Sequence, residues 1–275
     1  MMQTSFSTLA CPDWSLSQAL EAAVNYGFDG VELRVISREL DLWKLPEFQP
    51  NSLALTRRHI GGLGLQISCV GSSARFDSPD LQERQKNVDS VLRVAEVAAG
   101  LGAPAVRVFP DRIRSGYNYV QTAGWIVESL VGVAEKLESS GVQVWLETHG
   151  DFATETAVST ILQAVNRTDV GLIWDPANAF SQNNEPPLFL PEVQTHLRHV
   201  HVKDLELSGT GDVKYVLTGE GEFPFDALFA ALEAVRYQRF VSFEWEKHWH
   251  PELAPPEVAL PHFMKWWKHR KVEAC

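Results

Sequence analysis

Val144-Trp145-Leu146-Glu147-Thr148-His149 is a run of β-forming and apolar residues that ends in a carboxylate and an imidazole two positions apart. Side chains alternate between the two faces of a strand, so Glu147 and His149 are expected to point the same way. A strand that is apolar on both faces is typical of a parallel sheet covered on both sides, where an inward glutamate is unusual. The stretch therefore predicts a buried strand that presents functional side chains at its C-terminal end.

Three later stretches repeat this pattern of an apolar strand with a polar side chain at its end. They are residues 171–175, which end in Asp175, residues 198–204, which carry His201, and residues 240–246, which carry Glu244. Together with Glu147 they offer three carboxylates and one imidazole. Such a set suits one divalent metal ion, Mn²⁺, Mg²⁺ or Co²⁺, and Zn²⁺ is also compatible.

Eight predicted strands alternate with helical segments about 30 residues apart. The strands are expected at residues 5–10, 28–34, 65–70, 105–109, 144–149, 171–175, 198–204 and 240–246. The longer helices are expected at residues 53–60, 79–100, 119–139, 154–165, 225–235 and 256–271, with loops at 181–191 and 207–223, the latter a loop or hairpin. This alternation predicts an α/β fold, a (β/α)8 TIM barrel that forms a single domain over residues 1–275.

A doubly wound open sheet is the competing fold. It would place a glycine-rich phosphate turn after an early strand, whereas Gly61-Gly62-Leu63-Gly64 precedes one. In a barrel the active site lies at the C-terminal ends of the strands. All four candidate ligands fall there, which favours the barrel.

Composition narrows the class of protein. The 275 residues carry 24 basic and 35 acidic side chains, a formal charge of −11 that disfavours binding to a nucleic acid backbone. Cys11, Cys69 and Cys275 are too few and too scattered to indicate a disulfide framework. The first ten residues do not resemble a signal peptide, and no apolar run reaches the ~18 residues of a membrane span. We expect a soluble cytoplasmic protein with no nucleic acid or membrane partner; a homo-oligomeric state stays open.

Five stretches resemble the xylose-isomerase-like TIM barrel superfamily of sugar and sugar phosphate isomerases and epimerases, also labelled AP endonuclease family 2. They are Phe-Asp-Gly-Val-Glu at 28–32, Leu-Glu-Thr-His-Gly at 146–150, Trp-Asp-Pro-Ala-Asn at 174–178, His-Val-His-Val-Lys-Asp at 199–204 and Val-Ser-Phe-Glu at 241–244. The resemblance implies that Glu147, Asp175, His201 and Glu244 hold one metal ion, the set that patterning also gives. It further implies that Glu147 and Glu244 are the acid–base pair, as in the ketose 3-epimerases. Those epimerases tend to carry histidine where this chain has Asn178.

Other polar residues near the strand ends are candidates for substrate binding, to sugar hydroxyls or a phosphate. They are His149, Asn178, Lys203, Glu246 and Arg34. Deeper in the barrel, His199 is expected to be structural, and Arg107 and Glu32 are expected to form an ion pair. The tryptophans of the basic tail, residues 265–271, are expected to pack on the barrel.

Three of the four ligands also have a structural alternative, and Glu246 is the alternative ligand to Glu244. For Glu147 the alternative is a salt bridge at a strand end, for Asp175 it is the cap of a helix that starts at Pro176, and for His201 it is a core position with a hydrogen bond to a backbone carbonyl.

The function expected from these residues is isomerisation or epimerisation of a sugar or sugar phosphate, by proton transfer through a metal-stabilised enediolate. A dehydratase of the inosose or dehydroshikimate type, built on the same site, is the close alternative. An apurinic-site endonuclease is disfavoured, because its cluster of three metal ions needs more histidines at strand ends. A barrel that binds a sugar or metal without catalysis is disfavoured by the two opposed carboxylates.

Overall fold

The computed structural model describes residues 2–183, 185–187, 189, 191–208 and 213–273. Its barrel strands are β1 (Gln3–Ser7), β2 (Gly30–Leu33), β3 (Gln66–Arg75), β4 (Ala105–Phe109), β5 (Gln143–Glu147), β6 (Val170–Trp174), β7 (Leu197–Val202) and β10 (Phe240–Phe243). Its α-helices are α1 (Leu16–Tyr26), α2 (Pro50–Gly62), α3 (Leu81–Leu101), α4 (Tyr119–Leu137), α5 (Glu155–Val165), α6 (Pro176–Asn183), α7 (Phe225–Ala234) and α8 (Pro256–Glu273).

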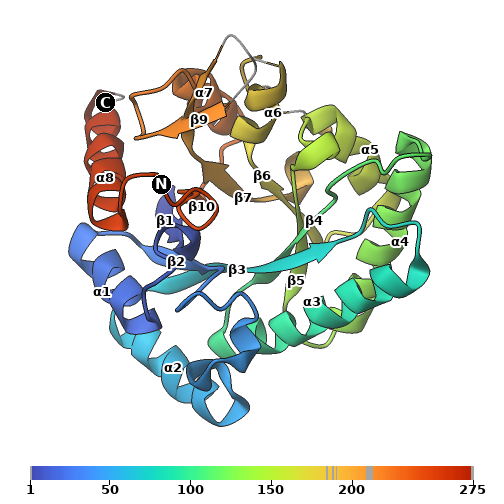
Figure 1. Ribbon diagram of the computed structural model, residues 1–275, viewed down its shortest axis with the longest axis horizontal. Helices are drawn as coiled ribbons and strands as arrows, with labels where there is room; N and C mark the ends of the chain where they lie inside the picture. The colour runs from blue at the N-terminus through green and yellow to red at the C-terminus, as the bar shows by residue number, and fades with distance from the viewer. Residues whose placement is uncertain (1, 184, 188, 190, 209–212, 274–275) are drawn as a thin grey trace.

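Within the described residues, eight parallel strands close into a barrel in the order β1-β10-β7-β6-β5-β4-β3-β2, and the helices surround it (Figure 1). The ring closes because β1 pairs with β10 on one side and with β2 on the other. The predicted (β/α)8 barrel is therefore confirmed, and the open doubly wound sheet is excluded.

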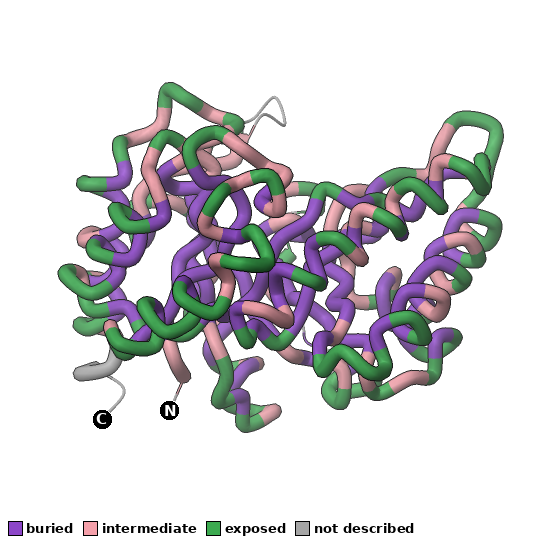
Figure 2. Tube along the Cα trace, turned by 90° about the horizontal axis from the view of Figure 1, so that it is seen from below, coloured by how far each residue is buried: buried purple, intermediate pink, exposed green. Residues whose placement is uncertain are grey.

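Alternation along β5 divides its side chains between two environments, as the sequence predicts. Val144 and Leu146 belong to the large apolar core, whereas Trp145 belongs to a small cluster with Cys69, Ala105 and Ile173. Trp145 fits only because residue 171 on β6 is glycine, since a Cβ on Gly171 would lie 2.2 Å from the indole Cδ1. Figure 2 shows the buried positions gathered inside the molecule, with the exposed ones on the outer faces of the helices. Glu147, two residues after Trp145, points to the inside of the barrel.

Several of the predicted boundaries are wrong. The predicted strand at residues 5–10 stops at Ser7, because the Ser7 side chain accepts a hydrogen bond from the Leu9 N–H and starts a 3-10 helix at Thr8–Ala10. The predicted loop at residues 181–191 begins too early, because α6 continues to Asn183.

The segment after β7 forms an antiparallel hairpin of β8 (Asp204–Leu207) and β9 (Val213–Val216). This confirms the hairpin alternative for residues 207–223, of which residues 209–212 lie outside the described part. The tail tryptophans pack as predicted: Trp267 is 2% exposed, with its ring centroid 5.7 Å from that of Phe229 on α7.

Cys11 and Cys69 are buried free thiols, and Cys275 lies outside the described residues. Across the described residues, no helix combines the length and the apolar character that crossing a membrane requires.

Candidate metal centre

The four predicted metal ligands come from four strands that are neighbours in the barrel. Glu147 is the last residue of β5, Asp175 follows β6, His201 lies on β7, and Glu244 follows β10. One ligand atom from each lies within 4.8 Å of those of the other three, and all four residues are buried. The structure thus brings the whole predicted set to the C-terminal end of the barrel, around a space of the size of one cation.

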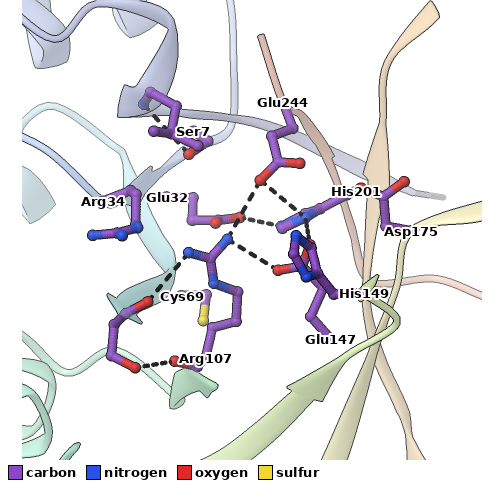
Figure 3. Close-up of polar contacts among 12 residues, drawn as sticks. Ser7, Glu32, Arg34, Cys69, Arg107, Glu147, His149, Asp175, His201 and Glu244 are labelled. Carbon is purple, nitrogen blue, oxygen red and sulfur yellow. Dashed lines mark hydrogen bonds and ion pairs between the residues drawn. The ribbon is translucent and has the colours of Figure 1, made fainter. Parts of the chain in front are cut away.

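His201 is held in one orientation by a carboxylate beneath it. Its Nε2 donates to Glu32 Oε2 over 2.9 Å, and its Nδ1 faces Glu244 Oε1 at 3.4 Å and Glu147 Oε1 at 3.6 Å. Nδ1 is buried and makes no hydrogen bond. Figure 3 shows the ring between Glu32 on one side and the two ligand glutamates on the other. This is not the core histidine bonded to a backbone carbonyl: the free ring nitrogen points into the carboxylate set.

Glu32 is the residue whose role sequence reasoning missed. Its Oε2 also accepts a hydrogen bond from Nε2 of His199, at 2.9 Å, so one fully buried carboxylate supports two histidines of β7. Burial alone would raise the pKa of Glu32, but the charges and hydrogen bonds of His201 and His199 hold it well below its usual range. A signal did exist, since alternation places His199 and His201 on one face, two residues apart.

The predicted ion pair between Arg107 and Glu32 is wrong. Arg107 Nη1 lies 3.0 Å from Glu147 Oε2 and 3.4 Å from Glu244 Oε1. Alternation fixes the face on which Arg107 lies, but not how far its long side chain reaches along the barrel. Arg107 instead bridges the two glutamates expected to move protons.

Lys203 contacts the ligand set from the other side. Its Nζ lies 2.7 Å from Asp175 Oδ2, 2.7 Å from Glu244 Oε2 and 2.9 Å from Glu246 Oε1. The four carboxylates of Glu147, Asp175, Glu244 and Glu246 carry four negative charges, and Lys203 and Arg107 carry two positive ones. These groups carry more negative than positive charge, and the ionised Glu32 beneath His201 adds to the excess, which favours a bound cation.

Asp175 uses its two oxygens differently. Oδ1 accepts hydrogen bonds from the backbone N–H groups of Ala177, at 3.0 Å, and Asn178, at 3.3 Å, and so caps α6. Oδ2 is left for Lys203 and the ligand set. The capping alternative is therefore present in the structure alongside the ligand position. Burial raises the pKa of Asp175 to about 6, against the opposing charge of Lys203.

A cavity of about 270 Å³, called here the mouth cavity, opens beside the ligand set. Glu147 and Glu244 line it, and so do four of the predicted substrate residues, Arg34, His149, Lys203 and Glu246. Trp249, which is 52% exposed, stands among the lining residues.

Asn178 differs from the other predicted substrate residues. Its Nδ2 donates to the backbone carbonyl of Thr148 over 2.9 Å, and it does not line the mouth cavity. Its side chain braces the end of β5 instead.

The lining residues that were not predicted as part of the site include Ser73, Arg75 and Trp249. Ser73 and Arg75 lie on β3, which continues five residues past the predicted end at residue 70. Trp249 lies in an irregular segment after β10, where no periodic pattern points to a site.

The comparisons with known proteins agree with this architecture. The family described as xylose isomerase-like TIM barrel matches residues 20–270. The uncharacterized protein YihM of Escherichia coli (strain K12) is 28% identical over 173 residues, which cover 61% of this chain. The match covers 52% of YihM, so the chain spans about half the length of that relative.

Three solved structures share the fold at low sequence identity. The IolI protein with a bound zinc atom has a TM-score of 0.80 at 19% identity, covering 96% of each chain. D-psicose 3-epimerase from Clostridium cellulolyticum H10, solved with D-tagatose, has a TM-score of 0.71 at 17% identity, covering 88% of this chain and 84% of its own. The probable 3-DHS dehydratase AsbF from Bacillus anthracis has a TM-score of 0.72 at 16% identity, covering 97% and 99%.

Because the family match spans almost the whole barrel, from α1 to α8, the chain belongs to the xylose isomerase-like TIM barrel family.

Proposed function

We propose that the chain is an enzyme that uses one divalent metal ion to isomerise or epimerise a small polyhydroxy carbonyl compound. The observation that carries the proposal is the set of Glu147, Asp175, His201 and Glu244, buried together within 4.8 Å beside the mouth cavity. The fold is shared with an epimerase solved with D-tagatose and with a protein that binds zinc, which supports the same chemistry.

The residues present fit a divalent cation. His201 Nδ1 is a buried nitrogen without a hydrogen bond that faces two carboxylates, and the carboxylates around it outnumber the cationic side chains Lys203 and Arg107. Three oxygens and one imidazole suit Mn²⁺, Mg²⁺, Co²⁺ or Zn²⁺. When bound, the ion would supply Lewis-acid polarisation of the substrate carbonyl, which acidifies the neighbouring C–H.

We assign the movement of the proton to Glu147 and Glu244. Both border the cavity, and they come from β5 and from the end of β10, with β6 and β7 between them in the ring. We propose that a carboxylate oxygen of one removes the proton next to the carbonyl and that the other returns a proton to the opposite face or to the neighbouring carbon. Burial opposes ionisation of Glu147, but the charge of Arg107 lowers its pKa, so it is ionised at neutral pH, as a base must be.

Solvent deuterium tests this assignment. The metal-loaded protein is incubated in D₂O with a panel of ketoses and ketose phosphates, and the carbon next to the carbonyl should gain deuterium for the true substrate. Glu244→Gln should keep much of the metal and lose ~10²–10⁴-fold in turnover, the effect typical of losing a general acid–base group. Glu128→Gln, which alters a surface partner of Arg84, is the matched control and should leave turnover unchanged.

Three other experimental outcomes would each point to a different reaction. Product that contains no solvent deuterium would indicate hydride transfer, and the two glutamates would then be metal ligands only. Release of water after deuterium exchange would identify a dehydratase, the chemistry named for AsbF. Nicking of abasic-site DNA as fast as sugar turnover would overturn the isomerase assignment.

A further inference from the structure

Arg34 differs from the other basic residues that line the mouth cavity. Each of those has a carboxylate partner: Arg107 has Glu147, Lys203 has Asp175, and both Arg75 and His149 have Asp111. Arg34 is only 3% exposed, and among the described residues it forms no ion pair with a carboxylate. A buried guanidinium that no carboxylate contacts directly is costly, so its retention beside a cavity needs an explanation.

The hydrogen bonds of Arg34 leave one nitrogen free. Nη2 donates to Ser73 Oγ over 2.7 Å, whereas Nη1 is buried and has no hydrogen-bond partner. Because Ser73 accepts that hydrogen bond, its own O–H can donate to a third group. Arg34 and Ser73 therefore lie side by side in the wall of the mouth cavity, and Nη1 of Arg34 and the O–H of Ser73 each keep a donor that no protein acceptor is seen to use.

The neighbouring strand is shaped to admit this arginine. A Cβ on Gly71 of β3 would lie 2.6 Å from Arg34 Cδ and 3.2 Å from Arg107 Nη2, so only glycine leaves room for both side chains. In Figure 3 the guanidinium of Arg34 lies on the side of Arg107 away from Asp175. Burial and the charge of Arg107 lower the pKa of Arg34 to about 9, against the opposing charges of Glu147, Glu244 and Glu32. Arg34 thus stays protonated at neutral pH.

In the ring of strands, Arg34 lies opposite Asp175. It directly follows β2, which is four places from β6 in either direction around the barrel, three from β5 and β7, and two from β10. A substrate whose carbonyl end lies at the ligand set, near Asp175, can therefore extend toward Arg34. The cavity volume of about 270 Å³ limits that substrate to a small molecule.

We propose that Arg34 and Ser73 bind an oxyanion group of the substrate, a carboxylate or a phosphate, and that the substrate is therefore a sugar acid or a sugar phosphate rather than a neutral sugar. This inference rests on the proposed function only in assigning the other end of the substrate to the metal. A guanidinium is well matched to both anions, because its planar N–H groups can donate two parallel charge-assisted hydrogen bonds.

The test compares three probes of the same carbon skeleton: glycerol 3-phosphate, glycerate and glycerol. Calorimetric titration of the metal-loaded protein should show tighter binding of at least one anionic probe than of glycerol. Arg34→Gln should weaken that binding by at least about 10-fold and leave the weak binding of glycerol unchanged. Which anionic probe responds identifies the phosphate or the carboxylate. Arg84→Gln, which removes a buried arginine of α3 away from the cavity, should leave all three affinities unchanged.

Ser73→Ala gives an independent test at an exposed residue, in case Arg34→Gln does not fold. It should weaken anion binding several-fold while the protein stays folded. Equal affinity of the wild type and both variants for the two anionic probes would overturn the proposal, because the anion would then not need Arg34. Failure of the wild type to bind either anionic probe would also overturn it.

Metal analysis of the same samples separates this proposal from the proposed function. Arg34-dependent anion binding in a protein that holds no metal would refute the metal-dependent reaction and leave the anion site standing.

Discussion

Glu32 should control how tightly His201 holds a metal ion, although Glu32 is not one of the four candidate ligands. Its Oε2 accepts the Nε2–H of His201 and that of His199, both at 2.9 Å, and it is fully buried. A carboxylate in this position fixes which ring nitrogen is free for the metal and makes that nitrogen more basic.

The expected loss of metal affinity follows from what each substitution of Glu32 removes. Glu32→Gln keeps the size of the side chain and one oxygen that can accept from both histidines, as Oε2 does, but it loses the charge. We expect about 10-fold weaker metal binding, or about 1.4 kcal/mol, at the lower end of the range for such supporting groups. Glu32→Ala removes the shared acceptor, and we expect about 100-fold weaker binding. It should also lower the free energy of unfolding by ~3–5 kcal/mol, because two buried imidazoles lose their partner.

The assay is competition for Zn²⁺ or Mn²⁺ against a chromophoric chelator of known affinity, with denaturant unfolding of the metal-free protein measured alongside. Glu155→Gln is the matched control, because Glu155 is a partly buried carboxylate outside the ligand set. It accepts a hydrogen bond from the Nε1–H of Trp174. Unchanged metal affinity in Glu32→Ala would refute the argument that Glu32 orients the histidine.

Removal of the metal with a chelator should lower the melting temperature, since an ion at 100 times its Kd stabilises the native state by about 2.7 kcal/mol; His201→Ala should lose the ion yet stay folded, and full metal occupancy in that variant would refute the ligand set. Gly71→Ala should lower the free energy of unfolding by ~1–3 kcal/mol in urea titrations because its Cβ meets Arg34, whereas Gly132→Ala, with nothing within 4 Å, should not destabilise. Hydrogen bonds from Arg114 and then Ser78 lower the pKa of Glu83 to about 2, so its contribution to stability is complete above pH 4.5 and lost as the pH falls toward 2. Because Glu83 is partly exposed, Glu83→Gln should cost less than ~1 kcal/mol at pH 6, and a cost that persists at pH 2 would contradict the assignment.

The ligand set could be predicted from the sequence because two simple rules suffice. Alternation along each apolar strand fixes the face of Glu147 and His201, and the barrel rule brings the strand ends together. Asp175 and Glu244 each follow a strand directly, so a small error in the strand boundary does not move them away from the site.

Contacts across the barrel could not be predicted in the same way. Whether Arg107 meets Glu32 or Glu147 depends on the reach of its side chain along the barrel axis, which residue spacing does not encode. Trp249 reaches the cavity from an irregular segment without a periodic pattern. The sequence pattern treats ligand and helix cap as alternatives for Asp175. The structure uses its two carboxylate oxygens separately, Oδ1 for the cap and Oδ2 toward the ligand set.

The closure of the ring has a consequence for the order of folding. Glu32 and His201 are 169 residues apart in the chain, and Arg107 and Glu244 are 137 apart, so both contacts join distant parts of the chain. Loop-closure entropy makes such contacts expensive before the intervening strands are in place. A cation held by this set would therefore favour the finished ring over partly folded chains. Its effect would fall on the rate at which the barrel opens, not on the rate at which it forms, and so it would prolong the lifetime of the native protein.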